Sequence, residues 1–380
     1  MPAGRPDPFS LRLAVVIKRF VTTGGAERYA VETTRRLRAR GHQVALVARE
    51  WEPAAVEGLG KHRLSDRGRW SSVVSSWWFA RDAARCLAAV PTDAVIAHER
   101  GFRQDIAVVH TFPYRRGIAR YAGWRRIDQL YLSPRSWLHL HLEAQQMRTT
   151  HLAAVSQTIR SDIAQYYRRR RNVAVVHPGV DLERFAPGAQ GPQRAATRAA
   201  VGAAPEDTLI VFVGTEFKRK GLDDLMAALG PGQRLVAVGK GERWPRYRRL
   251  VERLGIAERV HFAGFVADVR PYYQAADLLV LPSLAEAFGM CVLEAMACGL
   301  PVVVRAAAGA AALVAHGRNG FVFTAAEELP PLLARLNDPA LRGPMGAEAR
   351  RTACRFTWDA AADRLEALCR QVAAGSAVPD

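Results

Sequence analysis

Short apolar runs recur along the chain, and segments of mixed apolar and polar residues separate them. Runs of this length, rich in valine, leucine and isoleucine, are typical of strands buried on both faces of a parallel sheet. In the first half, the runs that predict strands lie at residues 11–20, 43–48, 93–98, 107–112, 152–156 and 173–179. In the second half, they lie at residues 208–214, 234–239, 259–265, 277–283 and 301–304. The pattern therefore predicts two successive α/β halves.

The segments between these runs carry helix signals. After the first strand, Thr22 or Thr23 can cap a helix, the pair Gly24 and Gly25 supplies the turn, and Gly41 ends the helix. Alternation of strands and helices predicts two doubly wound, Rossmann-like domains that face each other across a cleft. A stretch rich in Gly, Pro and Ala at residues 184–207 separates the halves. We therefore expect domains at 1–185 and 186–355, followed by a helix at 356–380.

The second half contains a strand, loop, helix and strand with two carboxylates between the strands. Glu286 falls in the loop and Glu294 in the helix, and Phe288, Gly289 and Met290 form the turn that begins the helix. In such units ligands bind beyond the carboxyl ends of strands, and a helix N-terminus offers free N–H groups to an anion. The two carboxylates can therefore hold two parts of one ligand. The alternative is a helix with two solvated acids.

A second motif is the basic turn at residues 214–221, between a predicted strand and the next helix. It contains Lys218, Arg219 and Lys220. Cationic side chains at this position would neutralise a diphosphate, and arginine can bind phosphate through two hydrogen bonds. A solvated basic turn is the alternative.

Together these motifs resemble those of family 4 glycosyltransferases, retaining enzymes of the GT-B fold that use nucleotide sugars. The resemblance implies that Glu286 contacts the donor sugar and Glu294 hydrogen-bonds the ribose. It also implies that backbone amides near Phe288, Gly289 and Met290 hold the sugar and phosphate. Lys220 matches the phosphate-binding lysine of the family. The usual arginine is replaced by Thr215, so we expect Arg219 to take its role.

The resemblance extends over nearly the whole chain. Residues 177–185 are similar to the hinge of the family, with Pro178 where an asparagine is common, and residues 262–269 are similar to the loop beside the nucleotide base. The first domain would then bind the acceptor and the second the nucleotide sugar, and the helix at 356–380 would return to the first domain. A looser likeness is to lipopolysaccharide core glucosyltransferases.

Candidates in the first half follow predicted strands. Gly24 and Gly25 lie where a donor phosphate or an acceptor can approach the backbone closely, although a plain tight turn is the alternative. His110 ends a predicted strand, and the resemblance implies contact with the donor sugar and acceptor. Asp105 is a further candidate for the acceptor hydroxyl, and His98 is a weaker one. A structural role for His110 stays open.

The formal charge of +18 is concentrated in one segment, because residues 112–171 contain twelve arginines against three acidic residues. Arginines interleaved with aromatic residues suit an anionic lipid surface, and they also suit single-stranded nucleic acid or an ordinary helical hairpin. We favour the membrane, with a surface formed by Arg115, Arg116, Tyr121, Trp124, Arg125 and Arg126. Five scattered cysteines and the lack of a long apolar segment favour a cytoplasmic protein, peripheral on the inner face of the plasma membrane.

The sequence therefore predicts a retaining hexosyltransferase. The expected donor is UDP-glucose and the expected acceptor a lipid-linked anionic saccharide, such as the lipopolysaccharide inner core. A different donor such as GDP-mannose, with another glycolipid or capsule as acceptor, is the alternative within the family. A nucleic-acid-binding protein and a nucleotide-sugar epimerase are rivals from other classes. Because Asp223 and Asp224 lie in a predicted helix as solvated residues and no DxD motif is evident, we expect no metal and no cofactor.

Overall fold

The computed structural model of the chain describes residues 10–68, 71–119, 123, 127, 132–188, 191–241 and 244–375. Two compact units are present. Unit 1 consists of Met1–Gly179 and Trp358–Asp380, and unit 2 consists of Val180–Thr357. The chain therefore passes from one unit to the other after residue 179 and returns after residue 357, whereas the sequence placed these changes after 185 and 355.

Unit 1 is built on a seven-stranded sheet in which every pairing is parallel. The strand order is β5-β3-β1-β6-β7-β8-β9. Their bounds are β1 Arg12–Val16, β3 Gln43–Ala48, β5 Gly60–Arg63, β6 Ala94–Ala97, β7 Ile106–Val109, β8 His151–Ala154 and β9 Val173–Val175. A separate pair joins β2 (Arg19–Phe20) to β4 (Glu50–Trp51). The central strands are buried throughout, which explains their unbroken apolar sequences.

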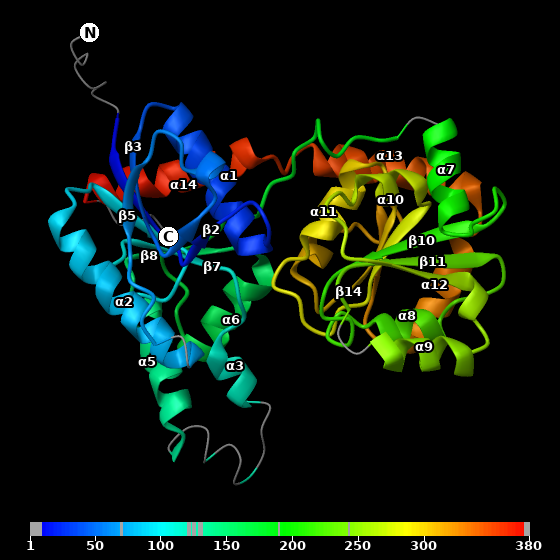
Figure 1. Cartoon of the computed structure of the whole chain (residues 1–380), viewed down its shortest axis with the longest axis horizontal. Helices are drawn as coiled ribbons and strands as arrows, with labels where there is room; N and C mark the ends of the chain where they lie inside the picture. The colour runs from blue at the N-terminus through cyan, green and yellow to red at the C-terminus, as the bar shows by residue number, and fades with distance from the viewer. Residues whose placement is uncertain are drawn as a thin grey trace. The chain divides into compact units, whose positions relative to one another are not determined.

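Helices cover both faces of this sheet (Figure 1). Their bounds are α1 Gly25–Ala39, α2 Ser72–Ala89, α3 Tyr114–Ala119, α5 Pro134–Met147, α6 Gln157–Tyr167 and α14 Trp358–Ala373, with a 3₁₀ turn at Pro53–Ala55. Phe79 of α2 packs with Ala14 and Val16 of β1 in one apolar cluster.

The last helix belongs to unit 1. Helix α14 lies beside α1, and the Trp358 ring meets Tyr29 edge to face with ring centroids 5.9 Å apart. Arg40 reaches α14 through its guanidinium, which lies 2.8 Å from Glu366 and 2.6 Å from Asp363. Apolar burial and ion pairs therefore both fix α14 against residues from the start of the chain.

Unit 2 repeats this architecture with six parallel strands in the order β12-β11-β10-β13-β14-β15. The strands are β10 Thr208–Val213, β11 Gln233–Val238, β12 Val260–Gly264, β13 Leu278–Leu281, β14 Val302–Arg305 and β15 Gly320–Phe323. The helices are α7 Pro192–Ala200, α8 Leu222–Ala227, α9 Trp244–Arg253, α10 Arg270–Ala275, α11 Met290–Ala297, α12 Leu329–Arg335 and α13 Pro339–Ala353, with 3₁₀ turns at Ala257–Arg259, Gly309–Leu313 and Ala326–Glu328. Helices α8, α9 and α12 lie on one face and α7, α10, α11 and α13 on the other (Figure 1).

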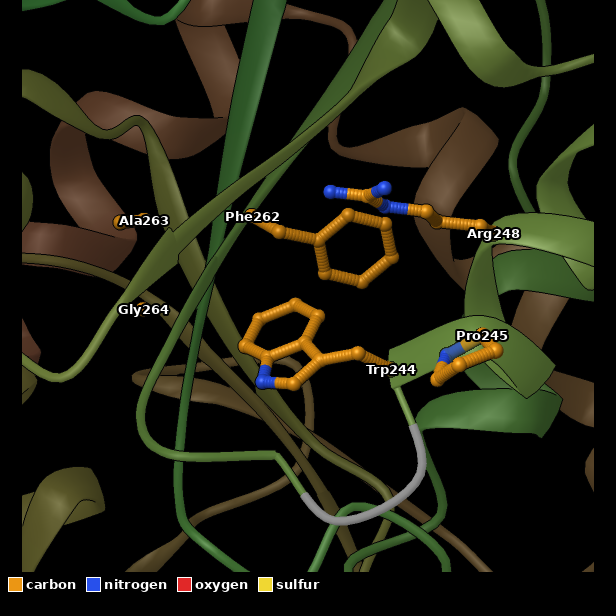
Figure 2. A pocket seen from close by; sticks show the side chains of 6 residues that line it. All are labelled: Trp244, Pro245, Arg248, Phe262, Ala263 and Gly264. Atoms are coloured by element: carbon orange, nitrogen blue, oxygen red, sulfur yellow. The ribbon is translucent and has the colours of Figure 1, made fainter.

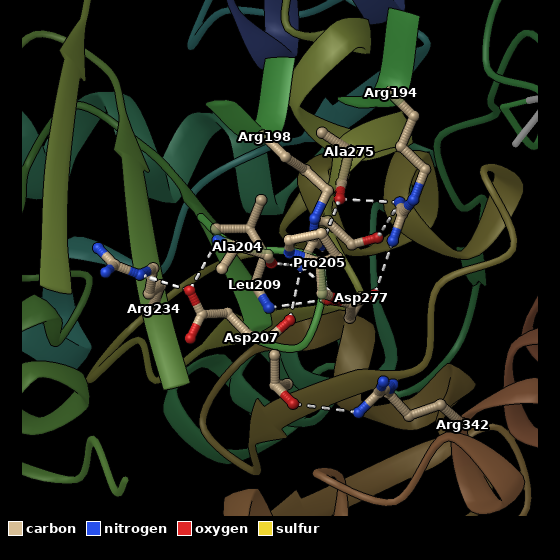
Figure 3. A network of polar contacts seen from close by, with 12 residues as sticks. Arg194, Arg198, Ala204, Pro205, Asp207, Leu209, Arg234, Ala275, Asp277 and Arg342 are labelled. Carbon is tan, nitrogen blue, oxygen red and sulfur yellow. Dashed lines mark hydrogen bonds and ion pairs between the residues drawn. The ribbon is translucent and has the colours of Figure 1, made fainter. Parts of the chain in front are cut away.

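A polar network closes the amino edge of the unit 2 sheet (Figure 3). Asp277, just before β13, accepts hydrogen bonds from Arg194 (2.8 Å), from Arg198 (2.9 Å) and from the Leu209 amide (2.7 Å). The network ties α7, which begins the unit, to the first residues of β10 and β13. It occupies the amino edge of the sheet, whereas in parallel α/β sheets ligands bind at the carboxyl edge.

The observed strands match the predicted ones with four differences. Strands β4, β5 and β15 were not predicted, and residues 11–20 were predicted as one strand where the structure has β1 and β2. The predicted helix cap was also wrong, because Gly24 takes the cap position of α1 and Thr22 instead donates its hydroxyl to Glu52 at 2.8 Å. The α/β fold with two parallel sheets is confirmed.

Candidate active site

Three loops meet at the carboxyl edge of the unit 2 sheet. They are residues 214–221 after β10, residues 282–289 after β13 and residues 306–313 after β14. The Leu284 amide donates to the Arg219 carbonyl at 2.9 Å, which joins the first two loops. The amides of Gly309 and Ala310 donate to the carbonyls of Glu286 and Phe288 at 2.9 and 2.7 Å, which joins the last two. The backbone that carries Glu286 is therefore held from both sides.

The Glu286 carboxylate contacts both cations predicted from the basic turn. Its Oε2 lies 3.2 Å from Lys220 Nζ and 3.4 Å from Arg219 Nη1, and the Lys220 side chain is only 14% exposed. The Lys220 chain crosses Gly214, where an added Cβ would lie 2.2 Å from its Cδ. Although burial alone would lower it, the pKa of Lys220 is raised, because Cys291 and Glu286 lie close by. Lys220 is therefore a fixed positive charge at this edge.

Helix α11 begins immediately beside this cluster. Gly289 precedes it with φ of 98°, and an added Cβ would lie 2.8 Å from a Leu281 methyl group, so glycine is required here. Phe288 is 4% exposed, so its ring belongs to the core. In the described part of the chain, the amides of Gly289 and Met290 have no acceptor. The start of α11 can therefore donate to an anion, as predicted.

Glu294 lies one turn further along α11 and is 7% exposed. The Tyr273 hydroxyl donates to its Oε2 at 2.9 Å. Burial and the neighbouring Glu294 together raise the pKa of the Tyr273 hydroxyl well above its usual value. Burial, with a further contribution from Glu294, raises the pKa of the Cys298 thiol to about 12. The carboxylate is therefore enclosed and oriented by the protein, which suits recognition of a hydroxyl group.

The expectation that Asp223 and Asp224 are solvated is wrong. Asp223 pairs with Arg246, and Asp224 pairs with Arg305, a residue of β14 that is 9% exposed. Arg305 also donates to the Pro282 carbonyl at 3.0 Å, so it anchors the loop that carries Glu286. Arg305 was not among the predicted site residues, although a charged residue that ends an apolar strand is a usable signal. Among the described residues, no three His, Cys, Asp or Glu side chains are grouped as metal ligands.

A pocket of about 660 Å³ lies at the carboxyl end of β12 (Figure 2). It is lined by Trp244, Pro245, Arg248, Phe262, Ala263 and Gly264. The rings of Trp244 and Phe262 meet edge to face, with centroids 5.2 Å apart. Part of the pocket lining therefore comes from the segment 262–269, which was predicted to lie beside the nucleotide base. The rest of the lining, from Trp244, Pro245 and Arg248, was not predicted.

Unit 1 contains a second pocket, of about 230 Å³, at the carboxyl edge of its own sheet. His110, directly after β7, lines it with His98, Lys18, Arg100 and His139. His98 Nδ1 and His110 Nε2 are 2.9 Å apart. Burial lowers the pKa of His110 to about 3 and, together with the neighbouring His110, lowers that of His98 well below its usual value. Both rings are therefore neutral at physiological pH.

The structure separates the other unit 1 candidates. Gly24 and Gly25 begin α1 as predicted, and Gly24 has φ of 99°. Asp105 precedes β7 whereas His110 follows it, so the two residues lie at opposite edges of the sheet, on the order of 16 Å apart along an extended strand. Asp105 accepts a hydrogen bond from the Val95 amide at 2.9 Å. Asp105, the further candidate for the acceptor hydroxyl, therefore lies at the edge of the sheet opposite to the pocket that His110 lines. Its hydrogen bond to the Val95 amide favours a structural role.

The predicted membrane surface is described only in part. Tyr121, Trp124, Arg125 and Arg126 lie outside the described residues. Arg115 is exposed, with its guanidinium over the Tyr167 ring.

Arg116 differs from the expectation, because it pairs with Asp162 at 2.6 Å and its side chain is 17% exposed. It is a structural ion pair rather than a surface cation. Trp137, an aromatic residue of the same basic segment, is exposed, and so are three apolar side chains nearby in the sequence that were not predicted: Phe102, Ile127 and Leu132. No helix in the described ranges is long and apolar enough to cross a bilayer.

Comparisons with known proteins agree with this description. The family model Glycosyltransferase Family 4 matches residues 23–184, and the model Glycosyl transferases group 1 matches residues 193–351. The D-inositol 3-phosphate glycosyltransferase of Segniliparus rotundus is 35% identical over 246 residues, which cover 60% of this chain and 53% of that protein. The chain spans about half the length of the curated relatives it matches.

Two solved structures show the same fold at low sequence identity. The first is WaaG, a glycosyltransferase involved in lipopolysaccharide biosynthesis, with a TM-score of 0.80, 23% identity, and coverage of 93% of this chain and 98% of that chain. The second is Anabaena HepE in complex with UDP-glucose, with a TM-score of 0.72, 20% identity, and coverage of 96% and 99%. With a family model matching most of each unit, the chain belongs to the family 4 glycosyltransferases of the GT-B fold.

Proposed function

We propose that unit 2 binds a nucleoside diphosphate sugar and that the enzyme transfers its hexose with retention of configuration. The observation that carries this proposal is the cluster of Lys220, Arg219 and Glu286 beside the free amides that begin α11. Two cations and a helix N-terminus complement a leaving diphosphate. Glu286 would bind the sugar, because a carboxylate that is held by two cations remains an acceptor for sugar hydroxyls.

The remaining donor contacts follow from their positions in unit 2. Glu294 would accept from the ribose hydroxyls, since it is oriented by Tyr273. The pocket between Trp244 and Phe262 would receive the base, because aromatic rings and Arg248 offer stacking surfaces. Transfer without a metal or cofactor fits this arrangement, since Lys220 and Arg219 supply the positive charge.

UDP-glucose is the proposed donor. One supporting observation is that Anabaena HepE, with the same fold, was solved with UDP-glucose bound. GDP-mannose is the alternative donor, because none of the described residues that line the base pocket carries a carboxylate that could select guanine over uracil. In the proposed reaction the acceptor hydroxyl attacks C1 from the face that the diphosphate leaves, and a phosphate oxygen takes the hydroxyl proton.

The proposed acceptor is a lipid-linked anionic saccharide, reached from the cytoplasmic surface of a membrane. The charge of +18 and the exposed Leu132 and Trp137 support this acceptor, because cations attract anionic headgroups and aromatic residues prefer the interface. A small phosphorylated cyclitol is the second candidate. It is favoured by the names of the relatives and by the unit 1 pocket of about 230 Å³, which is the right size for one ring.

Thermal stabilisation by nucleotide sugars tests the donor. We expect UDP-glucose at 100 times its Kd to add about 2.7 kcal/mol to the stability of unit 2. Glu294→Gln and Lys220→Met should each reduce the shift, and Lys218→Met is the matched control, because Lys218 is exposed in the same turn. A shift with GDP-mannose alone would change the donor but keep the reaction. If no nucleotide sugar raises the Tm while oligonucleotides bind, the nucleic-acid-binding alternative replaces this proposal.

The acceptor requires a separate experiment. We expect the enzyme to float with phosphatidylglycerol vesicles, not with neutral vesicles, and expect Trp137→Ser to weaken the binding. Radiolabelled sugar should then appear in the lipid fraction, with the anomeric configuration of the donor. Transfer to inositol 3-phosphate without any vesicle binding would instead establish the second candidate. Donor conversion to an epimer in the absence of any acceptor would identify an epimerase.

A further inference from the structure

Two histidines in unit 1, the buried His98 and the half-buried His110, form one hydrogen-bonded unit. His98 directly follows β6 and His110 directly follows β7, and these strands are parallel neighbours with Ile96 opposite Ile106. Their carboxyl ends therefore meet at one edge of the sheet, which brings the two side chains together. The distance from His98 Nδ1 to His110 Nε2 is 2.9 Å, and the ring planes are only 22° apart. The N–H of one ring can therefore point along the in-plane lone pair of the other.

Tyr29 holds both rings in place. Its ring centroid lies 5.8 Å from His98 and 5.0 Å from His110, with an edge-to-face arrangement in both pairs. Tyr29 is fully buried, its hydroxyl donates to the Val176 carbonyl, and Trp358 packs edge to face on its ring. The orientation of the histidine pair is therefore fixed by helices α1 and α14, which lie on the same face of the sheet.

A hydrogen bond between two neutral imidazoles couples their tautomers. If His98 Nδ1 carries the proton, His110 Nε2 must accept, and His110 then carries its own proton on Nδ1. If His110 Nε2 carries the proton, His98 Nδ1 must accept and its own proton moves to Nε2. The ring nitrogens outside the shared bond, His98 Nε2 and His110 Nδ1, have no partner among the described residues, and both rings line the pocket.

We propose that His98 is a positioning residue that fixes the tautomer and orientation of His110 in the acceptor pocket. The inference rests on the proposed function, with the unit 1 pocket that His110 lines as the acceptor pocket, as the family resemblance implies. A hydroxyl group that meets His110 then finds either an N–H donor or a lone pair at Nδ1, and not a mixture of the two. Without His98 the ring could adopt both tautomers, and the productive fraction of the enzyme would fall. The depressed pKa of both residues supports this view, because it keeps both rings neutral.

The test compares His98→Leu, which cannot hydrogen-bond His110, with His98→Asn, whose amide nitrogen can replace Nδ1. Imidazole ¹⁵N chemical shifts report the tautomer of each histidine directly, and His110→Gln assigns the His110 signals. In the wild type we expect one protonated and one unprotonated His110 nitrogen. In His98→Leu the two shifts should move towards each other, and kcat for sugar transfer should fall about 10-fold or more with KM for the donor unchanged. His98→Asn should restore both readings.

Two results would overturn the inference. One is an unchanged His110 spectrum in His98→Leu, which would show that His98 does not control the tautomer. The other is a changed spectrum with unchanged kcat, which would show that the tautomer is irrelevant to transfer. If the wild-type protein transfers no sugar, the proposed function fails, and the spectrum by itself still decides whether His98 fixes His110.

Discussion

Glu143 is a buried carboxylate whose loss should destabilise unit 1 strongly. It lies on α5 and is 1% exposed. Its Oε1 accepts from Arg100 Nη2 and from the Tyr114 amide, both at 2.7 Å. Its Oε2 accepts from the Arg115 amide at 3.3 Å and from the Tyr167 hydroxyl. One side chain thus joins α5 to the start of α3, the end of α6 and the loop after β6.

The cost of Glu143→Gln follows from these four contacts. The amide oxygen of glutamine can keep the bonds from Arg100 and Tyr114, but its NH₂ group then faces the Arg115 N–H, which is a second donor. We expect a loss of about 1.5–3 kcal/mol from weakened charge-assisted bonds and about 1–3 kcal/mol from the orphaned amide. The sum, about 2.5–6 kcal/mol, brackets the cost of about 3–5 kcal/mol that is usual for breaking a buried ion pair.

Intrinsic fluorescence can follow this change in unit 1, because Trp244 is the one tryptophan of the eight that lies in unit 2. A domain of this size loses about 2–4 °C in Tm per kcal/mol, so we expect the transition to fall by about 10 °C. Glu32→Gln is the control, because it removes the same charge from a half-exposed pair with Arg36 that contributes about 0.3–0.5 kcal/mol. A fall of less than about 2 °C in Glu143→Gln, or an equal fall in both variants, would refute the reasoning.

Three further predictions concern other residues. Asp105→Ala should lower the Tm by a few degrees, because the hydrogen bond to the Val95 amide is lost, and it should leave kcat unchanged. A large loss of kcat at unchanged Tm would instead indicate a catalytic role for Asp105. Cys354 is exposed and should react with a thiol reagent at pH 8. Burial raises the pKa of the Cys291 thiol to about 12, so Cys291 should stay unreactive until the protein unfolds. Thiol titration with and without denaturant would show the difference. Although burial opposes the shift, hydrogen bonds from Arg370 and Arg40 and the nearby His42 lower the pKa of Glu366 to about 2. The stability that Glu366 contributes is therefore complete above pH 4.5 and is lost as the pH falls towards 2. Unfolding in urea across this range should show a weaker pH dependence in Glu366→Gln.

The sequence predicted those parts of the fold in which burial is complete. Strands such as β13 and β14 are buried on both faces, so they appear as unbroken apolar runs. In contrast, β5 is an edge strand with the sequence GKHR and almost no burial, so its pairing with β3 leaves no apolar pattern. Strand β15 has the same length as β13 and β14, but it begins with Gly320, and glycine weakens the sequence signal of a strand. An added Cβ at Gly320 would meet the Val302 carbonyl.

The same limit applies to the candidate sites. Glu286 and Lys220 could be placed together because each follows a predicted strand, and these strands turned out to be neighbours. The ion pair of Asp224 with Arg305 could not be predicted, because it joins a helix to a strand end 81 positions away in the sequence. The pairing of His98 with His110 needed the order of β6 and β7 in the sheet, which local patterns do not encode.

The position of α14 has a consequence for synthesis of the protein on the ribosome. Trp358 and Leu365 are buried in unit 1, yet they are translated after the whole of unit 2. Unit 2 is a single continuous stretch, so it can fold as soon as it leaves the ribosome, while unit 1 waits with one side of α1 uncovered. N-terminal domains usually fold first during synthesis, but here the core of unit 2 can be completed before the core of unit 1. A nascent chain that stalls near residue 357 would expose the α1 surface to chaperones and proteases.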